Sequence, residues 1–423
     1  MSKSGNGFVI ETSTARKAIE GIKEKALEYL KRMVETNSFT YNAEGVDKVG
    51  DIVVEMFEPM GFEVERPAAI DCTPYKRPPL GRHVIMVRKG RTNKRIALCG
   101  HLDTVFTEQE ERDNDFHWRI EGDRIYGPGT IDMKGGNVVM WMTLRTIANL
   151  APNLFDEVTW VIMLNAAEEG LSSDFGMLER KYLGQDGLAN LIFESGREED
   201  GKHLIKAARK GRARISIKAT GRAAHAGAHH PKGANAIVQL SHFISEVSQL
   251  TDYDKDLTAN VGFVSGGVVP NRVPDRAEAL MEMRAFEPAV LRQALDKVLA
   301  WDGRSTVAST HDGYQARLDV KCVQLIECWP PNPKTEKLME IFQQTGAELG
   351  LHVAPRMGGG LSDGNFTWDI VPTIDGLGPC GDNGHCATRS DDGSVDQEYF
   401  LPASLVPRAL LACEVIQRLV KNQ

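Results

Sequence analysis

The chain has 423 residues, of which 42% are apolar and 26% are charged, and it carries a formal net charge of −8. A chain of this length buries a large core and favours two or more domains, and its composition is that of an ordinary globular protein. The negative charge argues against a nucleic-acid partner. No apolar run approaches the ~20 residues of a membrane span, and the first residues lack the apolar segment of a signal peptide, so we expect no membrane association.

Cysteine usage indicates a reducing compartment. The seven cysteines are irregularly spaced and form no CxxC pair; they stand at positions 72, 99, 322, 328, 380, 386 and 413. We expect reduced thiols in a cytoplasmic protein, most of them buried as small apolar side chains.

The first half of the chain alternates helix and strand patterns. Apolar spacing predicts helices over residues 15–37, 44–60 and 134–151. Strands are expected at residues 62–66, 83–89, 95–103, 158–169 and 188–196. The last three strands are short continuous apolar runs, which are typical of strands covered on both faces. This alternation predicts an α/β sheet with helices on its faces.

From about residue 209 the pattern changes to that of an inserted domain. Residues 211–227 alternate apolar and polar side chains, as a half-exposed strand does. The following elements are expected to be a helix at 235–250, strands at 257–267 and 277–286, a helix at 289–301 and a strand at 316–325. This β-α-β-β-α-β order is the signature of a ferredoxin-like α+β unit. We therefore expect a catalytic domain at 1–208 and 328–423, and an inserted domain at 209–327.

Metal-type ligands lie beside small or apolar residues over some 285 positions. They are His101 and Asp103 in GHLDTV, Asp132 in YGPGTIDMKGG, Glu168 and Glu169 in NAAEEG, Glu194 in FESG, and His385 in GDNGHC. Five of them lie at the C-terminal ends of predicted strands, where open α/β sheets place their ligands. Helix capping by these acids is the alternative interpretation. Two imidazoles with this surplus of carboxylates suit two ions that share a bridging carboxylate. The sequence thus predicts a hydrolase with two metals.

The residues indicate different roles within such a site. Asp103 shares a strand face with His101 and is placed to hold the second nitrogen of that imidazole. Asp132 lies in a glycine-rich turn and suits the bridge between two cations, whereas a lone aspartate before a helix is more often an N-cap. Of the adjacent Glu168 and Glu169, one is expected to bind metal and the other to act as general base.

Further candidates lie in the inserted domain. His225 stands among Ala and Gly residues and suits a donor to a substrate oxygen. Asn271 and Arg284 are candidates for contact with a substrate carboxylate or oxyanion. His229 and His230 are interpreted as surface residues.

These segments together resemble one enzyme family, the dinuclear zinc peptidases that include aminoacylase, acetylornithine deacetylase, succinyl-diaminopimelate desuccinylase and bacterial glutamate carboxypeptidase (glucarpidase). GHLDTV, YGPGTIDMKGGN, AAEEG, AHAG and the terminal GLG…H element stand in the family's order over roughly residues 20–420. RMGGGLSDGNFT and IDGLGP look closest to the glutamate carboxypeptidase group. The resemblance implies a catalytic domain with a mixed sheet covered by helices, and a ferredoxin-like lid and dimerisation domain inserted into it.

The resemblance also implies two Zn²⁺ ions per subunit, and carboxylate-rich sites of this kind accept Mn²⁺ or Co²⁺ as well. The implied ligands are His101, Asp132 and Glu194 for one ion, and Asp132, Glu169 and His385 for the other, with Asp132 bridging. A single-metal enzyme is the alternative.

The remaining roles follow from the same resemblance. Glu168 matches the general base, and Asp103 matches the residue that orients the first histidine ligand. His225 resembles the histidine that, in dimers of this family, reaches the active site of the neighbouring subunit. Asn271 and Arg284 match positions associated with substrate binding.

The sequence departs from the family in two places. After His385 the family often runs into a short stretch ending in Glu, whereas this chain continues as CATRSDDGSVDQEYF, with Cys386 beside the ligand. The segment CVQLIECWPPNP has no arginine to favour an acidic substrate side chain. Trp329 and its neighbouring prolines are expected instead to shape an apolar rim.

We therefore expect a zinc-dependent hydrolase that cleaves the amide or peptide bond next to a C-terminal amino acid. Its substrate would be a small peptide or an N-acyl amino acid, and its assembly a homodimer. The alternative enzyme is an N-acyl-amino-acid deacylase like aminoacylase or acetylornithine deacetylase. A catalytically inactive binding dimer is a third hypothesis, against which the intact ligand set argues.

Overall fold

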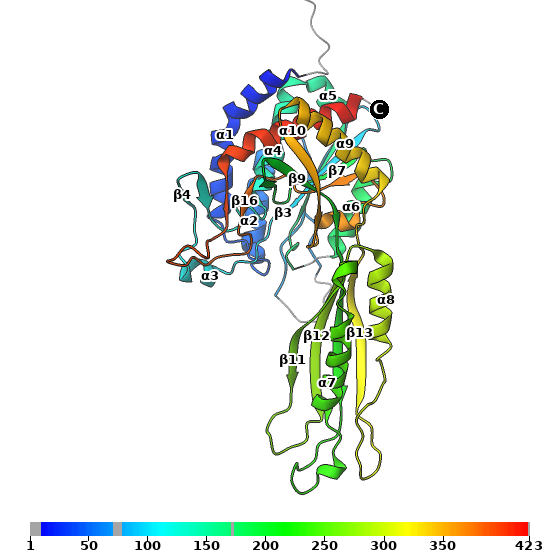
Figure 1. Cartoon of the computed structure of the whole chain (residues 1–423). Helices are drawn as coiled ribbons and strands as arrows, with labels where there is room; N and C mark the ends of the chain where they lie inside the picture. Colours follow the sequence, from blue (N-terminus) through cyan, green and yellow to red (C-terminus); the bar gives the residue numbers. More distant parts are fainter. Residues whose placement is uncertain (1–9, 71–77, 171–172, 422–423) are drawn as a thin grey trace, which may run out of the picture. The chain divides into compact units, whose positions relative to one another are not determined.

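The computed structural model describes residues 10–70, 78–170 and 173–421, which form two compact units (Figure 1). The first unit contains the chain up to residue 207, residues 331–357 and residues 362 onward. The second contains residues 208–330 and 358–361. The predicted combination of an α/β unit with an inserted α+β unit is confirmed. The short segment 358–361 was not predicted to join the inserted unit.

The first unit is built on a mixed sheet. In spatial order its strands are β1 (Glu63–Glu65), β2 (Val84–Arg88), β6 (Thr159–Asn165), β3 (Arg95–His101), β7 (Ala189–Ile192) and β15 (Thr373–Ile374). The strands β6, β3, β7 and β15 run parallel, whereas β2 runs antiparallel to β6 and β1. The parallel strands therefore bring their carboxyl ends to one edge of the sheet.

The strands of this sheet are buried on both faces, as their apolar runs predict. In β3, Ile96 and Leu98 join one core, whereas Ala97 and Cys99 join a second core on the opposite face. The helices that contribute to the first core include α1 (Thr12–Val34), α2 (Ala43–Phe57), α4 (Lys134–Leu150), α9 (Pro333–Glu348) and α10 (Leu405–Lys421). The second core is covered by α6 (Ser173–Leu183). Helices α1, α4 and α10 pack against one another (Figure 1). The unit is thus a layered α/β/α structure.

The second unit has the predicted ferredoxin-like order. Its elements are β10 (Gly211–Thr220), α7 (Ala236–Val247), β11 (Thr258–Gly266), β12 (Arg276–Ala285), α8 (Pro288–Leu299) and β13 (Arg317–Ile326). The sheet is antiparallel in the order β11-β12-β10-β13, so β11 and β13 form its edges. Every second residue of β10 is buried, and α7 and α8 supply the rest of that core. One face of this sheet is therefore apolar and the other is more exposed.

Short elements complete the two units, and their sequences lack the periodicity needed to predict them. The first set is η1 (Glu58–Met60), α3 (Glu108–Asp113), β4 (Arg119–Glu121), β5 (Arg124–Tyr126), α5 (Pro152–Glu157), β8 (Arg197–Glu199), β9 (Lys202–Arg209) and η2 (His230–Lys232). The second set is η3 (Ser248–Leu250), η4 (Tyr253–Lys255), β14 (His352–Gly358), η5 (Asp363–Phe366), β16 (Gly381–Asp382), β17 (Tyr399–Phe400) and η6 (Pro402–Ser404). They add two small sheets, β14-β9-β8 and β16-β17-β5-β4.

The described cysteines are all free thiols, and Cys99, Cys328, Cys380 and Cys413 are buried, as expected. Cys72 lies outside the described residues. Within the described ranges, no helix combines the length and the apolar character needed to cross a bilayer.

Candidate active site

The predicted metal ligands gather at the carboxyl edge of the parallel strands. His101 is the last residue of β3, and Glu194 follows the end of β7 by two residues. Glu168 and Glu169 lie in a turn that follows β6. Since these three strands are adjacent and parallel, their ends converge. The predicted placement at strand ends is confirmed.

Asp132 lies between the two histidines. Its Oδ1 is 3.0 Å from Nε2 of His101, and its Oδ2 is 3.2 Å from Nε2 of His385. His385 Nε2 is also 2.9 Å from Oε1 of Glu169, and His101 Nε2 is 3.6 Å from Oε1 of Glu194. One carboxylate therefore presents each of its oxygens to a different imidazole, and each imidazole faces a second carboxylate.

These separations fit a pair of divalent ions. Ligand atoms of His101, Asp132 and Glu169 lie within 4.8 Å of one another. Two nitrogen or oxygen ligands of one zinc ion, each at about 2.1 Å, are about 3.4 Å apart in a tetrahedral site. The distances around Asp132 are close to this value. Imidazole and carboxylate are also zinc ligands by type, so the residues fit the expected metal pair.

Asp103 holds the turn that carries both glutamates. Its Oδ1 accepts a hydrogen bond from the backbone N–H of Glu168 at 3.0 Å, and its Oδ2 accepts one from the N–H of Glu169 at 3.2 Å. The Thr40 hydroxyl donates to Oδ2 at 2.6 Å. Nδ1 of His101 is 3.0 Å from the backbone oxygen of Asp103 and 3.4 Å from its Oδ1. The carboxylate therefore fixes the Glu168–Glu169 turn, while the backbone oxygen is the nearer partner of the imidazole.

The two adjacent glutamates differ in their contacts. Glu169 pairs with His385, as described above. The Glu168 carboxylate forms no hydrogen bond or ion pair with the described residues. The turn thus directs Glu169 to His385 and leaves the Glu168 carboxylate without a side-chain partner among the described residues.

Glu398 fixes the turn that carries Asp132. This glutamate is fully buried, and its Oε1 accepts hydrogen bonds from the backbone N–H of Ile131 at 2.9 Å and of Asp132 at 3.2 Å. Burial, followed by the charge of Asp132, raises the pKa of Glu398 to about 8. Sequence reasoning missed both Glu398 and Thr40. A signal for Glu398 was present in the sequence. The segment after His385 is longer than is usual in the family, but its last residues, QEYF, do contain a glutamate.

The electrostatics of the site favour added positive charge. Burial raises the pKa of Glu168 well above its ordinary value, and the charge of Glu194 raises it further. Burial alone would raise the pKa of Asp132, but hydrogen bonds from His101 and His385 outweigh it and lower that pKa. Hydrogen bonds with Asp132 and then Glu169 raise the pKa of His385 to about 11. Buried like-charged carboxylates of this kind are stabilised by cations.

His385 itself has an unusual backbone conformation. Its φ is 68°, in the left-handed region that side-chain-bearing residues rarely adopt. Asn383, two residues earlier, has a φ of 61°. Two such residues in one short segment reverse the chain sharply, and this direction brings the imidazole to Asp132.

The candidates in the inserted unit fall at two ends of its sheet. His225 and Asn271 lie on paired segments, because the backbone N–H of Ala226 donates to the oxygen of Asn271 at 3.0 Å. Both residues are exposed. Arg284 lies near the opposite end of β12, where its Nε donates to Oε1 of Glu282 at 2.8 Å. The structure therefore brings His225 and Asn271 together and does not bring Arg284 to them.

Two expectations for the surface of the inserted unit have different outcomes. His229 and His230 are exposed, as predicted. The prediction that Trp329 shapes an apolar rim is wrong, because Trp329 is fully buried. Its backbone pairs with Arg209 through hydrogen bonds of 2.8 and 3.0 Å, which turns the indole into the core.

Comparison with known proteins extends these findings. The model of the family described as Peptidase family M20/M25/M40 matches residues 97–417. The chain is 25% identical to carboxypeptidase G2 of Pseudomonas sp. (strain RS-16), with 94% of each chain covered. It is 27% identical to acetylornithine deacetylase of Proteus mirabilis (strain HI4320), over 71% of this chain and 80% of the relative. A tripeptidase from Staphylococcus aureus subsp. aureus mu50 shares the fold, with a TM-score of 0.71 at 20% identity, over 94% of this chain and 99% of that one.

Proposed function

Because the chain belongs to the peptidase family M20/M25/M40 and is therefore a metallohydrolase of amide or peptide bonds, we propose a carboxypeptidase. It would release a C-terminal amino acid from a small peptide or N-acyl amino acid, as a glutamate carboxypeptidase does. The observation that carries this proposal is the position of Asp132, with one carboxylate oxygen against each of two imidazoles. The similarity to carboxypeptidase G2 along nearly the whole chain favours this substrate class over the others.

We propose that the site holds two divalent ions, Zn²⁺ first and Mn²⁺ or Co²⁺ as alternatives. The ligands would be His101, Asp132 and Glu194 for one ion, and Asp132, Glu169 and His385 for the other. Bound ions of this kind polarise a carbonyl oxygen and make water more acidic. The geometry that supports this assignment is the chain of short imidazole–carboxylate separations around Asp132.

Glu168 is the proposed general base. Among the residues that the structure describes, its carboxylate has no side-chain partner, whereas that of Glu169 is engaged by His385. Burial raises the pKa of Glu168, which makes its carboxylate a better proton acceptor than an exposed glutamate. Glu168 would accept a proton from the attacking water and pass it to the leaving amine. Asp103 would act as a positioning residue, because it holds the backbone N–H of Glu168.

His225 is the proposed donor to the developing oxyanion. Its Nδ1 accepts hydrogen bonds from the backbone N–H groups of Gly227 at 3.2 Å and Ala228 at 3.1 Å. A neutral imidazole that accepts at Nδ1 carries its proton on Nε2. The exposed Nε2–H is then free to donate to a substrate oxygen.

The inserted unit supports a contribution from two subunits. Arg276, which pairs with Thr220, is eight residue steps from Arg284 along β12, or about 27 Å at ~3.4 Å per step. His225 lies beyond the Thr220 end, so His225 and Arg284 of one subunit are too far apart to hold one small substrate. We propose that Arg284 binds the substrate carboxylate from one subunit, and that His225 with Asn271 acts from the other.

Strand β11 is the proposed dimer interface. It is an edge strand without charged side chains, whereas the other edge, β13, carries alternating charges. The exposed apolar residues around β11 are Ile237, Val238, Phe263, Val264, Val268 and Val269. An apolar edge strand pairs readily with its own copy across a two-fold axis. This supports the proposed homodimer.

A panel of substrates tests the proposed function. The zinc-loaded protein would be assayed against N-acyl-glutamate, N-acyl-aspartate, N-acyl-phenylalanine, N-acetylornithine and dipeptides. We expect release of a C-terminal amino acid that is lost with chelator and in Glu168→Ala, while metal content of that variant stays unchanged. Preference for N-acetylornithine would favour the deacylase alternative, which the relative from Proteus mirabilis supports. Bound metal without turnover of any substrate would contradict the proposal.

Subunit mixing tests the assignment of His225. The variants His225→Ala and Glu168→Ala are each expected to be inactive. After random exchange at equal amounts, half of the dimers are mixed and one of their two sites is intact, so about a quarter of wild-type activity returns. No recovery after demonstrated exchange would show that His225 does not act across the interface.

The free thiols agree with the cytoplasmic location that we also propose.

A further inference from the structure

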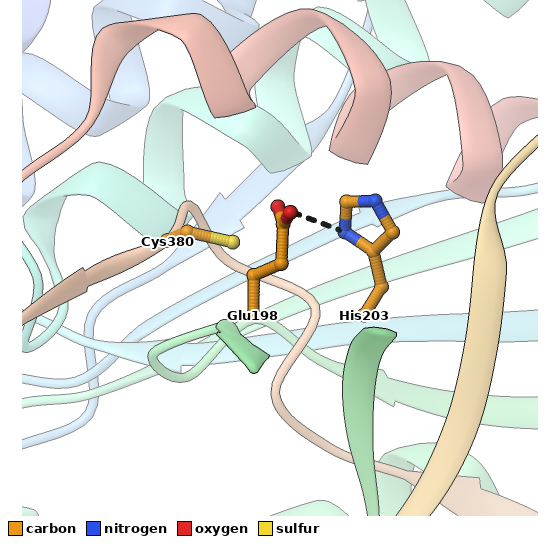
Figure 2. Close-up of side chains that lie close together, drawn as sticks. All are labelled: Glu198, His203 and Cys380. Carbon is orange, nitrogen blue, oxygen red and sulfur yellow. Dashed lines mark ion pairs between the residues drawn. The ribbon is translucent and has the colours of Figure 1, made fainter. Parts of the chain in front are cut away.

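A second group of metal-type side chains lies in the first unit. It consists of Glu198 from β8, His203 from β9 and Cys380, which directly precedes β16. Each offers one ligand atom, and these atoms all lie within 4.8 Å of one another. In Figure 2 the Cys380 sulfur and the His203 ring lie on opposite sides of the Glu198 carboxylate. None of the three belongs to the proposed ligand set around Asp132.

His203 has a buried nitrogen that finds no hydrogen-bond partner in the described part of the chain. The residue is only 8% exposed, and its Nδ1 is buried without such a partner among the described atoms. Oε2 of Glu198 lies 3.8 Å from this nitrogen, which is too long for a hydrogen bond. Two zinc ligands at about 2.1 Å are about 3.4 Å apart, so the separation is closer to that of two groups sharing an ion. The buried nitrogen and the carboxylate therefore face each other across a gap that is wide enough for a shared ion.

Cys380 supplies the sulfur of the cluster. The residue is 2% exposed, and Nη2 of Arg408 lies 3.2 Å from its Sγ. The same guanidinium donates to the backbone oxygens of Gly376 and Arg197, so its position is fixed by the fold. The thiolate is the form of a cysteine that binds metals, and in this cluster a guanidinium donates to the sulfur. With a divalent ion, a thiolate, a carboxylate and this guanidinium, the formal charge of the group is +1.

We propose that Glu198, His203 and Cys380 form a mononuclear site for a thiophilic divalent cation such as Zn²⁺, separate from the pair at Asp132. Sulfur, imidazole nitrogen and carboxylate oxygen are the three zinc ligand types, and a water completes a tetrahedral set. This site is a third metal position in the chain.

The position of this cluster indicates a structural role. Cys380 lies five residues before His385, and Glu198 lies four residues after Glu194. The two segments are already paired, because the backbone N–H of Gly196 donates to the oxygen of Pro379 at 2.9 Å. An ion bound by both segments would cross-link the segment that contains Glu194 to the segment that contains His385. Each segment carries one ligand of a different proposed catalytic ion.

Cobalt titration of the full-length protein tests this site. The chain would be stripped with chelator and titrated with Co²⁺, while total bound metal and thiolate-to-cobalt charge-transfer absorption are measured. We expect three Co²⁺ per chain, with the charge-transfer band arising from one of them. Cys380→Ser should lose the band and bind two Co²⁺. Glu198→Gln, at an exposed position, should keep its fold and weaken the band-forming step by about 10–100-fold.

Two cysteine variants serve as controls. Cys386→Ser removes the thiol beside His385, and Cys322→Ser removes a partly buried thiol of the inserted unit. Both should keep the band. The proposal is overturned if the wild type shows no band, if the band persists in Cys380→Ser, or if it disappears in Cys386→Ser. Activity is not the readout, so these outcomes are independent of the proposed carboxypeptidase function.

Discussion

Replacing Asp103 with asparagine tests how the turn with the two glutamates is held. Asp103 is fully buried, and its two oxygens accept from two backbone N–H groups and one hydroxyl. Asparagine has the same shape but only one oxygen, so its amide group faces at least one of these donors. Asp103→Asn therefore leaves at least one buried donor without an acceptor.

The size of the effect follows from this loss. A buried donor without an acceptor costs about 1–3 kcal/mol, and bonds to charged acceptors lie at the upper end. We expect the free energy of unfolding of Asp103→Asn to fall by about 2–3 kcal/mol. The N–H group that loses its acceptor belongs to Glu168 or Glu169. Metal affinity or kcat/KM should therefore fall by about 10–100-fold, as when other supporting groups of metal sites are changed.

The assay combines three measurements on purified Asp103→Asn, namely urea unfolding of the metal-free form, metal affinity by competition with a chelator, and kcat/KM. Thr40→Val is the matched control, because it removes only the hydroxyl donor and leaves both backbone N–H groups bound. The control should keep activity within a few-fold of wild type. Wild-type metal affinity and turnover in Asp103→Asn would refute the role assigned to the carboxylate.

Further predictions concern stability. Gly21→Ala, in α1, adds a Cβ that meets no other atom within 4 Å and should stabilise the fold by about 0.5–1 kcal/mol. Gly136→Ala places a Cβ 1.9 Å from the Phe193 backbone oxygen and should destabilise the fold by at least ~1–3 kcal/mol. Urea unfolding measures both effects. Glu398→Gln keeps an acceptor for two buried N–H groups, so it should unfold close to wild type, whereas Glu398→Ala should lose about 2–6 kcal/mol. Burial and a hydrogen bond to a glutamate raise the pKa of Tyr182 to about 12 in the folded protein. The unfolded chain therefore releases this proton at lower pH, and the free energy of unfolding falls between pH 10 and 12. Tyr182→Phe should lack this part of the alkaline loss of stability. Equal alkaline slopes for the wild type and that variant would contradict this reasoning.

The main sheet and the convergence of the candidate ligands at its edge were predictable because their signals are local. The apolar runs before His101 and Glu194 fix buried strands, and strand ends in an α/β sheet converge by topology. The ferredoxin-like unit was equally readable, since its strands alternate clearly between buried and exposed residues. In both cases the residue pattern of a single element already contains the information.

The supporting residues were not predictable for the opposite reason. Thr40 contacts a carboxylate 63 positions away, and Glu398 binds a backbone N–H 267 positions away. A backbone N–H is the same at every residue, so such a contact leaves no trace in the residue type of its partner. The error for Trp329 has a related cause. An aromatic residue beside prolines is typical of a pocket rim, and only the fold shows that this side chain is buried.

The parallel pair of β7 and β15 has a consequence for biosynthesis. These neighbouring strands are joined across the whole inserted unit, and the first residue of β15 is synthesised 181 residues after the last residue of β7 (373 − 192). At ~5–20 residues per second, the edge of β7 waits roughly 9–36 s for its partner on the ribosome. The inserted unit has time to fold during this delay, whereas the proposed ligand set stays incomplete until His385 is synthesised. Capture of the proposed metals would therefore come late in synthesis, and a chain that stops before β15 would leave this edge of β7 unpaired.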